Sequence, residues 1–120
     1  MADTPTHATQ VVISTGAGRT LFFAPIIQSA PGTTQLVAAE SSGNRIKVVN
    51  YIIIMSATGT AKFSDGSGDL TGTMPLAANG GIAAPSQPHS PWFQTAVNSA
   101  LSIVTTGGAA TGHLAYFLES

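Results

Sequence analysis

Residues 45–57, RIKVVNYIIIMSA, form the longest apolar segment of the chain, and they decide its fold class. Side chains of an extended strand alternate between two faces. The alternation gives two sets of residues: Ile46, Val48, Asn50, Ile52 and Ile54 against Lys47, Val49, Tyr51, Ile53 and Met55. Both sets are mostly apolar from Val48 onward. We therefore predict a central β-strand, covered by a second sheet on one face and by a neighbouring subunit or loop on the other.

The rest of the chain divides into short runs of β-branched and aromatic residues. The 13 Gly and 7 Pro residues separate these runs, and no long window repeats apolar positions at helical spacing without a breaker. The other predicted strands are 10–15, 19–27, 33–39, 60–64, 70–76, 82–84, 92–96, 100–105 and 112–118. This spacing predicts an all-β, single-domain antiparallel β-sandwich over residues 9–120, with a jelly roll as the expected topology. Residues 1–8 are polar, contain Pro5, and are predicted to form a flexible N-terminal arm.

The low charge is the most informative feature of the composition. Charged residues make up 8% of the chain, against about 25% in a typical globular protein. The fixed cations are Arg19, Arg45, Lys47 and Lys62, and the net charge is −1. Four scattered cations do not supply the field that phosphate neutralisation needs, so we expect no nucleic-acid partner. A surface of Thr, Ser, Gly, Ala and Asn suits a protein that packs against copies of itself or another subunit.

Membrane insertion and thiol chemistry are not expected. The first residues lack the basic start and the apolar stretch of a secretory signal. The apolar run Val48 to Met55 is far shorter than the about 20 residues that a membrane-spanning helix needs. The chain contains no cysteine, which excludes disulfide bonds and thiolate metal sites.

Residues that could carry chemistry are few. Asp65 and Asp69 flank a Gly/Ser turn, where two carboxylates could chelate Ca²⁺, although we favour a role in building the turn. His7, His89 and His113 lack the spacing of metal ligands, and we expect His113 to hydrogen-bond a backbone group. No Gly-x-Ser-x-Gly turn is present. We therefore predict no enzymatic activity, no catalytic residue, no metal and no cofactor.

Trp92 and Phe93 are neighbours at the start of a predicted strand, so only one of them can face the core. We favour Trp92 as the core residue. The alternative is an exposed Trp92 that stacks on a sugar ring.

From residue 44 to the end, several pieces of the chain follow one pattern. They are Lys62-Phe63, 70–76 (LTGTMPL), 79–82 (NGGI), 92–95 (WFQT), Ala100-Leu101 and 112–116 (GHLAY). In these pieces the chain resembles small virion proteins of tailed bacteriophages, and the resemblance covers about the last two thirds of the sequence. Pro91 stands where the pattern has glycine before the tryptophan. These are turn and core residues, so the resemblance says more about the fold than about the function.

The resemblance implies a small β-sandwich on the phage particle, such as a head decoration or cement protein. Such proteins often form homo-oligomers, trimers among them, and use N-terminal arms to reach the major capsid protein or another virion protein. The protein would be made in the cytoplasm of the host bacterium and reside in the virion. The residues expected to bind a partner lie in the arm and in a Pro-rich loop: Thr4, Pro5, Thr6, His7, Thr9, Ser86, Gln87, His89 and Trp92. Strand Val48–Met55 is a candidate for the contact between subunits.

Two other functions remain open from the sequence. A carbohydrate- or receptor-binding module of a tail or fibre would use Trp92 and His89, with Asp65 and Asp69 holding Ca²⁺. A small metal-dependent enzyme of the cupin kind would need clustered histidine and carboxylate ligands, which three isolated histidines do not provide.

Overall fold

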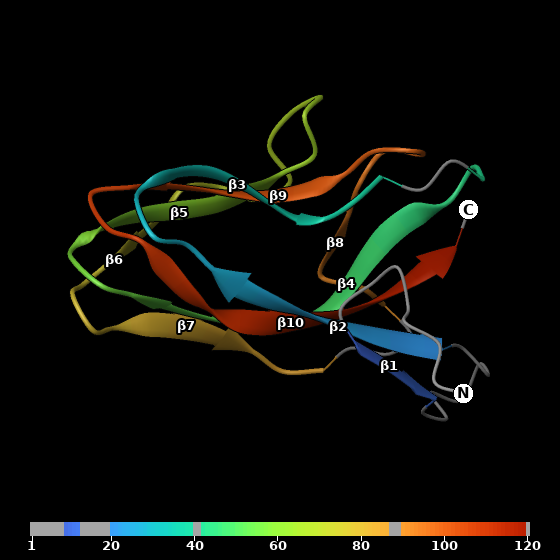
Figure 1. The fold of residues 1–120 in the computed structure, drawn as a ribbon, viewed down its shortest axis with the longest axis horizontal. Helices are drawn as coiled ribbons and strands as arrows, with labels where there is room; N and C mark the ends of the chain where they lie inside the picture. The colour runs from blue at the N-terminus through green and yellow to red at the C-terminus, as the bar shows by residue number, and fades with distance from the viewer. Residues whose placement is uncertain (1–8, 13–19, 40–41, 87–89, 120) are drawn as a thin grey trace.

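Ten β-strands and no helix make up the regular structure of the residues that the computed structural model describes, which are 9–12, 20–39, 42–86 and 90–119. Residues 9–12 are described by their backbone alone. The strands form two antiparallel sheets that pack face to face (Figure 1). The predicted all-β antiparallel sandwich is confirmed.

The two sheets, called sheet A and sheet B, combine strands from distant parts of the chain. Sheet A contains, in hydrogen-bonded order, β1 (Thr9–Val12), β2 (Thr20–Ile27), β10 (Ala110–Glu119), β4 (Arg45–Met55) and β7 (Gly81–Ala84), with β8 (Phe93–Gln94) also paired to β4. Sheet B contains β3 (Gly32–Val37), β9 (Leu101–Thr106), β5 (Gly59–Ser64) and β6 (Met74–Leu76). With the short strands β1 and β8 set aside, four strands lie in each sheet. This order is consistent with the expected jelly roll.

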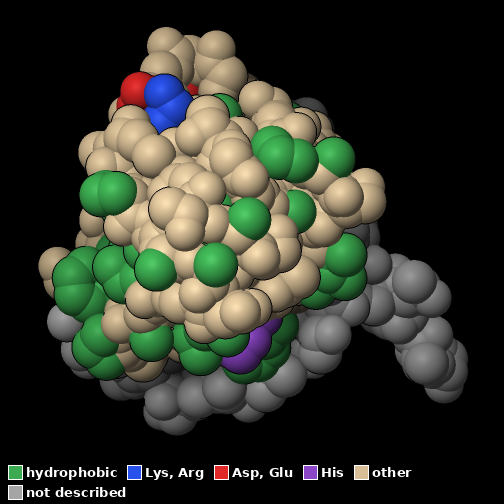
Figure 2. All heavy atoms as spheres, turned by 90° about the vertical axis from the view of Figure 1, so that its left-hand side faces the viewer, with side chains coloured by type: hydrophobic (Ala, Val, Ile, Leu, Met, Phe, Trp, Pro, Cys, Tyr) green, Lys and Arg blue, Asp and Glu red, His purple; other side chains and the backbone are tan. Residues whose placement is uncertain are grey.

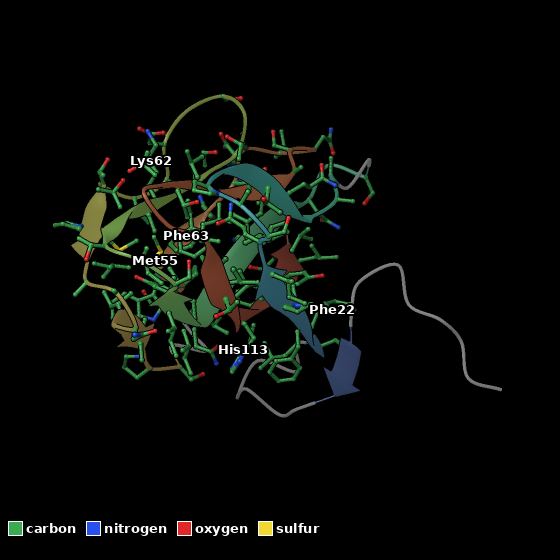
Figure 3. The ribbon with its side chains drawn as sticks, turned by 60° about the vertical axis from the view of Figure 1, so that its left-hand side comes forward. Phe22, Met55, Lys62, Phe63 and His113 are labelled. Carbon is green, nitrogen blue, oxygen red and sulfur yellow. The ribbon has the colours of Figure 1, made fainter. Side chains whose placement is uncertain are left out.

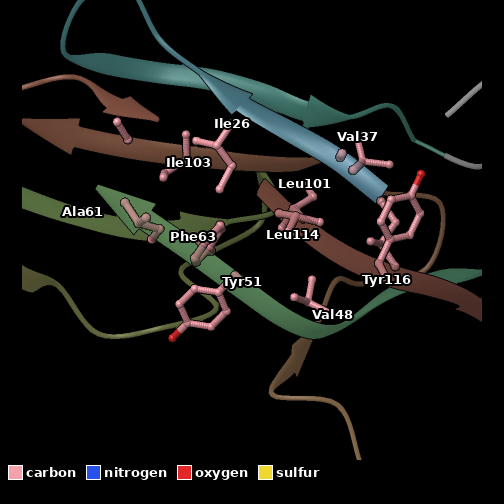
Figure 4. Packing of buried hydrophobic residues seen from close by; sticks show 14 of the residues in the cluster. Ile26, Val37, Val48, Tyr51, Ala61, Phe63, Leu101, Ile103, Leu114 and Tyr116 are labelled. Atoms are coloured by element: carbon pink, nitrogen blue, oxygen red, sulfur yellow. The ribbon is translucent and has the colours of Figure 1, made fainter. Parts of the chain in front are cut away.

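The core lies between the two sheets. Figure 4 shows side chains of sheet B, such as Phe63 and Ile103, directed toward Tyr51 and Leu114 of sheet A. The largest fully buried side chains are Tyr116, Phe63, Phe117, Ile26, Ile46, Ile53, Met55, Leu101, Ile103, Leu114, Val48 and Val49. Burying one large apolar side chain stabilises a fold by about 1.5–3 kcal/mol. Burial between the sheets is therefore the main force that holds the sandwich together.

A β-bulge in β4 overturns the predicted alternation of that strand. Ala115 of β10 pairs with Asn50, but the next residue, Tyr116, pairs with Val48, so Val49 is an extra residue without a partner in the ladder. An extra residue reverses the faces of everything beyond it. The residues of β4 that face the core are therefore Ile46, Val48, Tyr51, Ile53 and Met55. The single alternating sets predicted from residues 45–57 are wrong on this point.

Two other predicted strands are shorter than expected, and in each segment a threonine hydroxyl accepts a backbone N–H. In the segment predicted over 70–76, the Phe63 N–H donates to Thr71 Oγ1 at 3.1 Å, and the strand begins only at Met74. In the segment predicted over 92–96, the Thr95 N–H donates to the Ile46 carbonyl at 3.0 Å, but the Ile46 N–H donates to Thr95 Oγ1 at 3.0 Å, and the strand ends at Gln94. Residues 13–15 and 19 of the first two predicted strands lie outside the described residues.

A buried polar cluster joins the sheets at the end of β2. Gln28 follows β2 in sheet A, and its Oε1 accepts from Thr105 Oγ1 of sheet B at 2.7 Å and from the Ala110 N–H at 3.0 Å. Its Nε2 donates to the Gly32 carbonyl and to Thr34 Oγ1, both at 3.0 Å. All four hydrogen-bonding positions of the amide are thus used. The side chain fixes the crossover from β2 to β3.

Candidate interaction surface

The predicted N-terminal arm lies mostly outside the described residues. Thr4, Pro5, Thr6 and His7 belong to that part of the chain. Thr9 begins β1, and its backbone lies opposite Phe23 of β2. The first described strand, β1, is thus an edge strand of sheet A.

The Pro-rich loop between β7 and β8 contains a partly exposed tryptophan, contrary to the prediction that Trp92 is a core residue. Its side chain is 45% exposed, and the indole Nε1–H donates to the Pro85 carbonyl at 2.7 Å. Ser86 is exposed, whereas Gln87 and His89 lie outside the described residues. The loop therefore presents an aromatic side chain held by one hydrogen bond.

Phe93 takes the place in the core that was predicted for Trp92. Its ring centroid lies 4.8 Å from that of Phe63 and 5.9 Å from that of Tyr51. The reason is the pairing of β8 with β4, which sets Phe93 directly opposite Val48. Residues directly opposite each other in an antiparallel pair share a face, and Val48 faces the core. Trp92, one residue earlier, is therefore turned away from it.

The described members of the two predicted contact regions do not come together in one site. Thr9 lies on β1, at one edge of sheet A. Trp92 directly precedes β8, which pairs with β4 at the opposite side of the sheet. A single partner surface made of the arm and the Pro-rich loop of one subunit would have to span the width of sheet A.

Asp65 builds the loop between β5 and β6, as the turn interpretation predicts. Its Oδ1 accepts from the N–H groups of Ser67 and Gly68 at 2.9 and 3.0 Å, and its Oδ2 accepts from the Ala96 N–H at 2.8 Å. Burial raises the pKa of Asp65, but these backbone hydrogen bonds outweigh burial, so the pKa lies below its ordinary value. The carboxylate both closes the loop and ties it to the segment before β9.

Asp69 is engaged in the same loop. Its Oδ2 lies 3.0 Å from Lys62 Nζ in an ion pair on the surface of sheet B. Both carboxylates that were considered for Ca²⁺ thus bind donors of the protein. Within the described part of the chain, no group of three or more His, Cys, Asp or Glu side chains is placed to hold a metal ion.

The outer face of sheet A carries an exposed, uncharged patch, which we call the outer patch. Two rows of paired residues cross β2, β10, β4 and β7, and all eight members are exposed: Ile27, Thr111, Ile54 and Gly81 in one row, and Pro25, His113, Ile52 and Ala83 in the other. Ile27 is 70% exposed, Ile54 48% and Ile52 36%. No Lys, Arg, Asp or Glu belongs to either row. Solvent-exposed isoleucines at three positions of one sheet face mark a candidate contact surface.

The outer patch lies on the side of sheet A that faces away from the core. In Figure 3, His113 projects away from sheet A, on the side opposite Phe63 and Met55, while Lys62 lies beyond sheet B. Figure 2 shows hydrophobic side chains around an exposed histidine at the lower side and a Lys and an acidic side chain at the top. The His113 imidazole makes no hydrogen bond to the backbone of the described residues, so the bond expected from the sequence is not found there.

The predicted cover over strand Val48–Met55 is present on only half of the outer face. Val49 is buried in a second cluster with Leu21, Ala115 and Phe117. Ile52 and Ile54, farther along the strand, have no such cover and form the middle of the outer patch. The sequence identified the strand but missed the members from β2, β7 and β10, because only the pairing register brings them into rows.

The outer face of sheet B differs in character. Thr60 of β5 and Thr106 of β9 share a hydrogen bond of 2.6 Å between their hydroxyls, and Lys62 lies next to them on β5. Exposed Thr33 and Gln35 continue this polar surface on β3. The sandwich therefore has one apolar and one polar outer face.

Comparison of the chain with protein-family models, with curated proteins and with solved structures finds no match. No described segment forms a helix long and apolar enough to cross a membrane.

Proposed function

We propose that this chain is a non-enzymatic structural protein of a tailed-bacteriophage virion, a decoration or cement protein that binds and stabilises the assembled head. Its partners on this proposal are the major capsid protein, or another virion protein, and further copies of itself. The sequence resemblance over residues 44–120 supports this role, because it lies in turn and core residues that the sandwich uses, such as Phe63 and Leu114.

The observation that carries the proposal is the contrast between the two outer faces. A protein with only 8% charged residues gains little of its solubility from charge. It also presents an uncharged patch with three exposed isoleucines on sheet A and a polar, Thr-rich face on sheet B. Such a molecule suits a place within a shell, where the apolar face packs on other subunits and the polar face meets water.

The proposed mechanism is stabilisation by binding. A protein that binds the assembled shell and not its free subunits shifts the equilibrium toward the shell. The arm residues Thr4 to His7, together with Thr9 at the start of β1, would add a strand or an extended segment to a capsid subunit. The loop from Ser86 to Pro91, with Trp92, supplies a second contact at the other edge of sheet A.

The experiment that tests this role uses purified protein and phage particles that lack it. Co-sedimentation followed by electron microscopy is expected to show ordered density on the head at a fixed copy number. The particles should also resist heating better when the protein is bound. Absence of binding to head and tail would overturn the proposal.

A second candidate function is a carbohydrate- or receptor-binding module, and the exposure of Trp92 favours it. An indole that is 45% exposed and held by the Pro85 carbonyl can stack on the apolar face of a sugar. The test is a glycan screen with the parent protein and the Trp92→Ala variant. Binding that requires Trp92 would support this function, and a lack of binding to every glycan would count against it.

A further inference from the structure

We propose that two copies of this chain dock face to face through the outer patch of sheet A. The patch consists of the two exposed rows that cross β2, β10, β4 and β7. The proposal concerns the protein by itself. It can therefore stand or fall independently of the virion role.

The rows are complementary to themselves about a two-fold axis that runs along the strands midway between β10 and β4. Such an axis sets β2 of one copy over β7 of the other, so the most exposed isoleucine, Ile27, meets a glycine, Gly81. In the same row it sets Thr111 on Ile54 of the second copy. Large residues thus face small ones, as close packing between two sheets requires. A two-fold contact uses the same patch on both copies.

The second row is related by the same two-fold axis. Pro25 of β2 meets Ala83 of β7, and His113 of β10 meets Ile52 of β4. Packed sheets are rotated by about 30°, and the pairs next to the axis, on β10 and β4, are displaced least by that rotation. These central pairs are the ones on which the test below depends.

The distribution of charge favours a second copy over other partners. A charged partner surface would lose water at the patch and find no ion to pair with. A lipid surface would need Lys or Arg around the apolar residues. Among the described cations, Lys62 lies on sheet B, and Arg45 and Lys47 lie at the other end of β4, bonded to the Thr95 carbonyl and to Glu119. A copy of the same patch brings no formal charge into the contact.

The size of the patch sets the strength of the contact. Four strands about 4.8 Å apart and two rows about 7 Å apart give a footprint of roughly 270 Å² on each copy. Stable protein interfaces bury about 800 Å² on each partner. The contact is therefore reversible, and it becomes dominant only at high concentration or when copies are held side by side on a common scaffold.

The first test is sedimentation equilibrium of the full chain at pH 8 over about 10 µM to 1 mM, the range of weak affinities. We expect a reversible monomer–dimer equilibrium that Ile54→Lys weakens at least tenfold. Val97→Lys is the matched control, because Val97 is also an exposed apolar residue, at 44%, but lies outside the patch. Circular dichroism and urea unfolding show that each variant is folded. A monomer at every concentration, or equal weakening by Val97→Lys, would overturn the proposal.

The second test distinguishes the proposed arrangement from any other use of the patch. Ile54→Lys and Thr111→Glu should each abolish self-association, because each buries an unpaired charge twice. Their mixture should associate at least as tightly as the parent, because the introduced ammonium group of one copy then faces the introduced carboxylate of the other. A mixture that stays monomeric rules out the two-fold axis.

Neither experiment uses phage particles. Failure of self-association therefore leaves the head-binding experiment to decide the virion role, and failure of head binding leaves the dimer proposal standing.

Discussion

Gln28 and Thr105 join the two sheets through a buried hydrogen bond of 2.7 Å, from the Thr105 hydroxyl to the Gln28 amide oxygen. Gln28 is 7% exposed and Thr105 2%. The same amide oxygen accepts from the Ala110 N–H. A buried polar group that loses its hydrogen-bond partner costs about 1–3 kcal/mol. Substitution of either residue should therefore lower the free energy of unfolding.

We predict that Gln28→Leu lowers the free energy of unfolding by about 2–4 kcal/mol, because it leaves the Thr105 hydroxyl and the Ala110 N–H without an acceptor. Thr105→Val should cost less, about 1–2 kcal/mol, because Gln28 keeps its other partners. Urea unfolding followed by circular dichroism measures both. The control is Thr106→Val, which removes an exposed hydroxyl pair and should change stability by less than about 0.5 kcal/mol. Equal effects at positions 105 and 106 would refute the assignment.

The second prediction separates Trp92 from Phe93. Phe93→Ala removes a ring that packs on Phe63 and Tyr51 and should destabilise the protein by about 2–4 kcal/mol. Trp92→Ala removes a half-exposed ring with one hydrogen bond and should cost about 1 kcal/mol or less. Thermal unfolding of the two variants gives the order. A larger loss for Trp92→Ala would show that the tryptophan belongs to the core.

The third prediction is a pH dependence that comes from Asp65. Its pKa is lower in the folded protein than the ordinary value of 3.8. The stabilisation is therefore fully present above that value and is lost as the pH falls through the lowered pKa of the folded state. Asp65→Asn should cost about 1–2 kcal/mol at pH 7, since Oδ2 no longer accepts from the Ala96 N–H. The difference from the parent should be constant between pH 7 and 5 and shrink below pH 4.

Asp69→Asn is the control for that series. It removes an exposed ion pair with Lys62, which contributes at most about 1 kcal/mol and weakens with added salt. Urea unfolding at each pH measures the series. A difference between the parent and Asp65→Asn that stays the same down to pH 2 would contradict the assignment to the Asp65 carboxylate.

The fourth prediction concerns Gly112, the third residue of β10. Its φ is +152°, and a Cβ at this position would collide with the Ile52 carbonyl oxygen of β4. Gly112→Ala must therefore displace the ladder between the two longest strands, and we expect a loss of about 3 kcal/mol or more. Gly72→Ala is the control, because a Cβ there meets nothing within 4 Å. Near-parent stability of Gly112→Ala would show that the strands can separate freely at this point.

Much of the fold could be predicted from the sequence because its turns and strands are encoded locally. β-branched runs between Gly and Pro residues indicated the existence of the strands, and the boundaries of β4 came within two residues of those observed. The inward side chains of β5, Ala61 and Phe63, alternate without interruption. Where the pattern is local and regular, sequence reasoning is sufficient.

The parts that could not be predicted depend on pairing between distant strands. The residues around Val49 carry no local sequence signal for the bulge, because the bulge arises from the register of β4 with β10. The placement of Trp92 depends on the pairing of Phe93 with Val48, 45 residues away in the chain. The outer patch combines four strands, so its members, from Ile27 to His113, are neighbours only after folding.

The bulge at Val49 also bears on how the gene can change. Insertions and deletions of single residues are tolerated in loops but reverse the faces of a strand. Within β4, Val49 is the exception: with that codon deleted, plain alternation would still set Val48 and Tyr51 on the core face, and the packing of Val49 on Leu21 and Phe117 would be lost. Proteins descended from the same ancestor should therefore lose a residue of β4 only at the bulge and gather their other length changes in exposed turns such as residues 66–68.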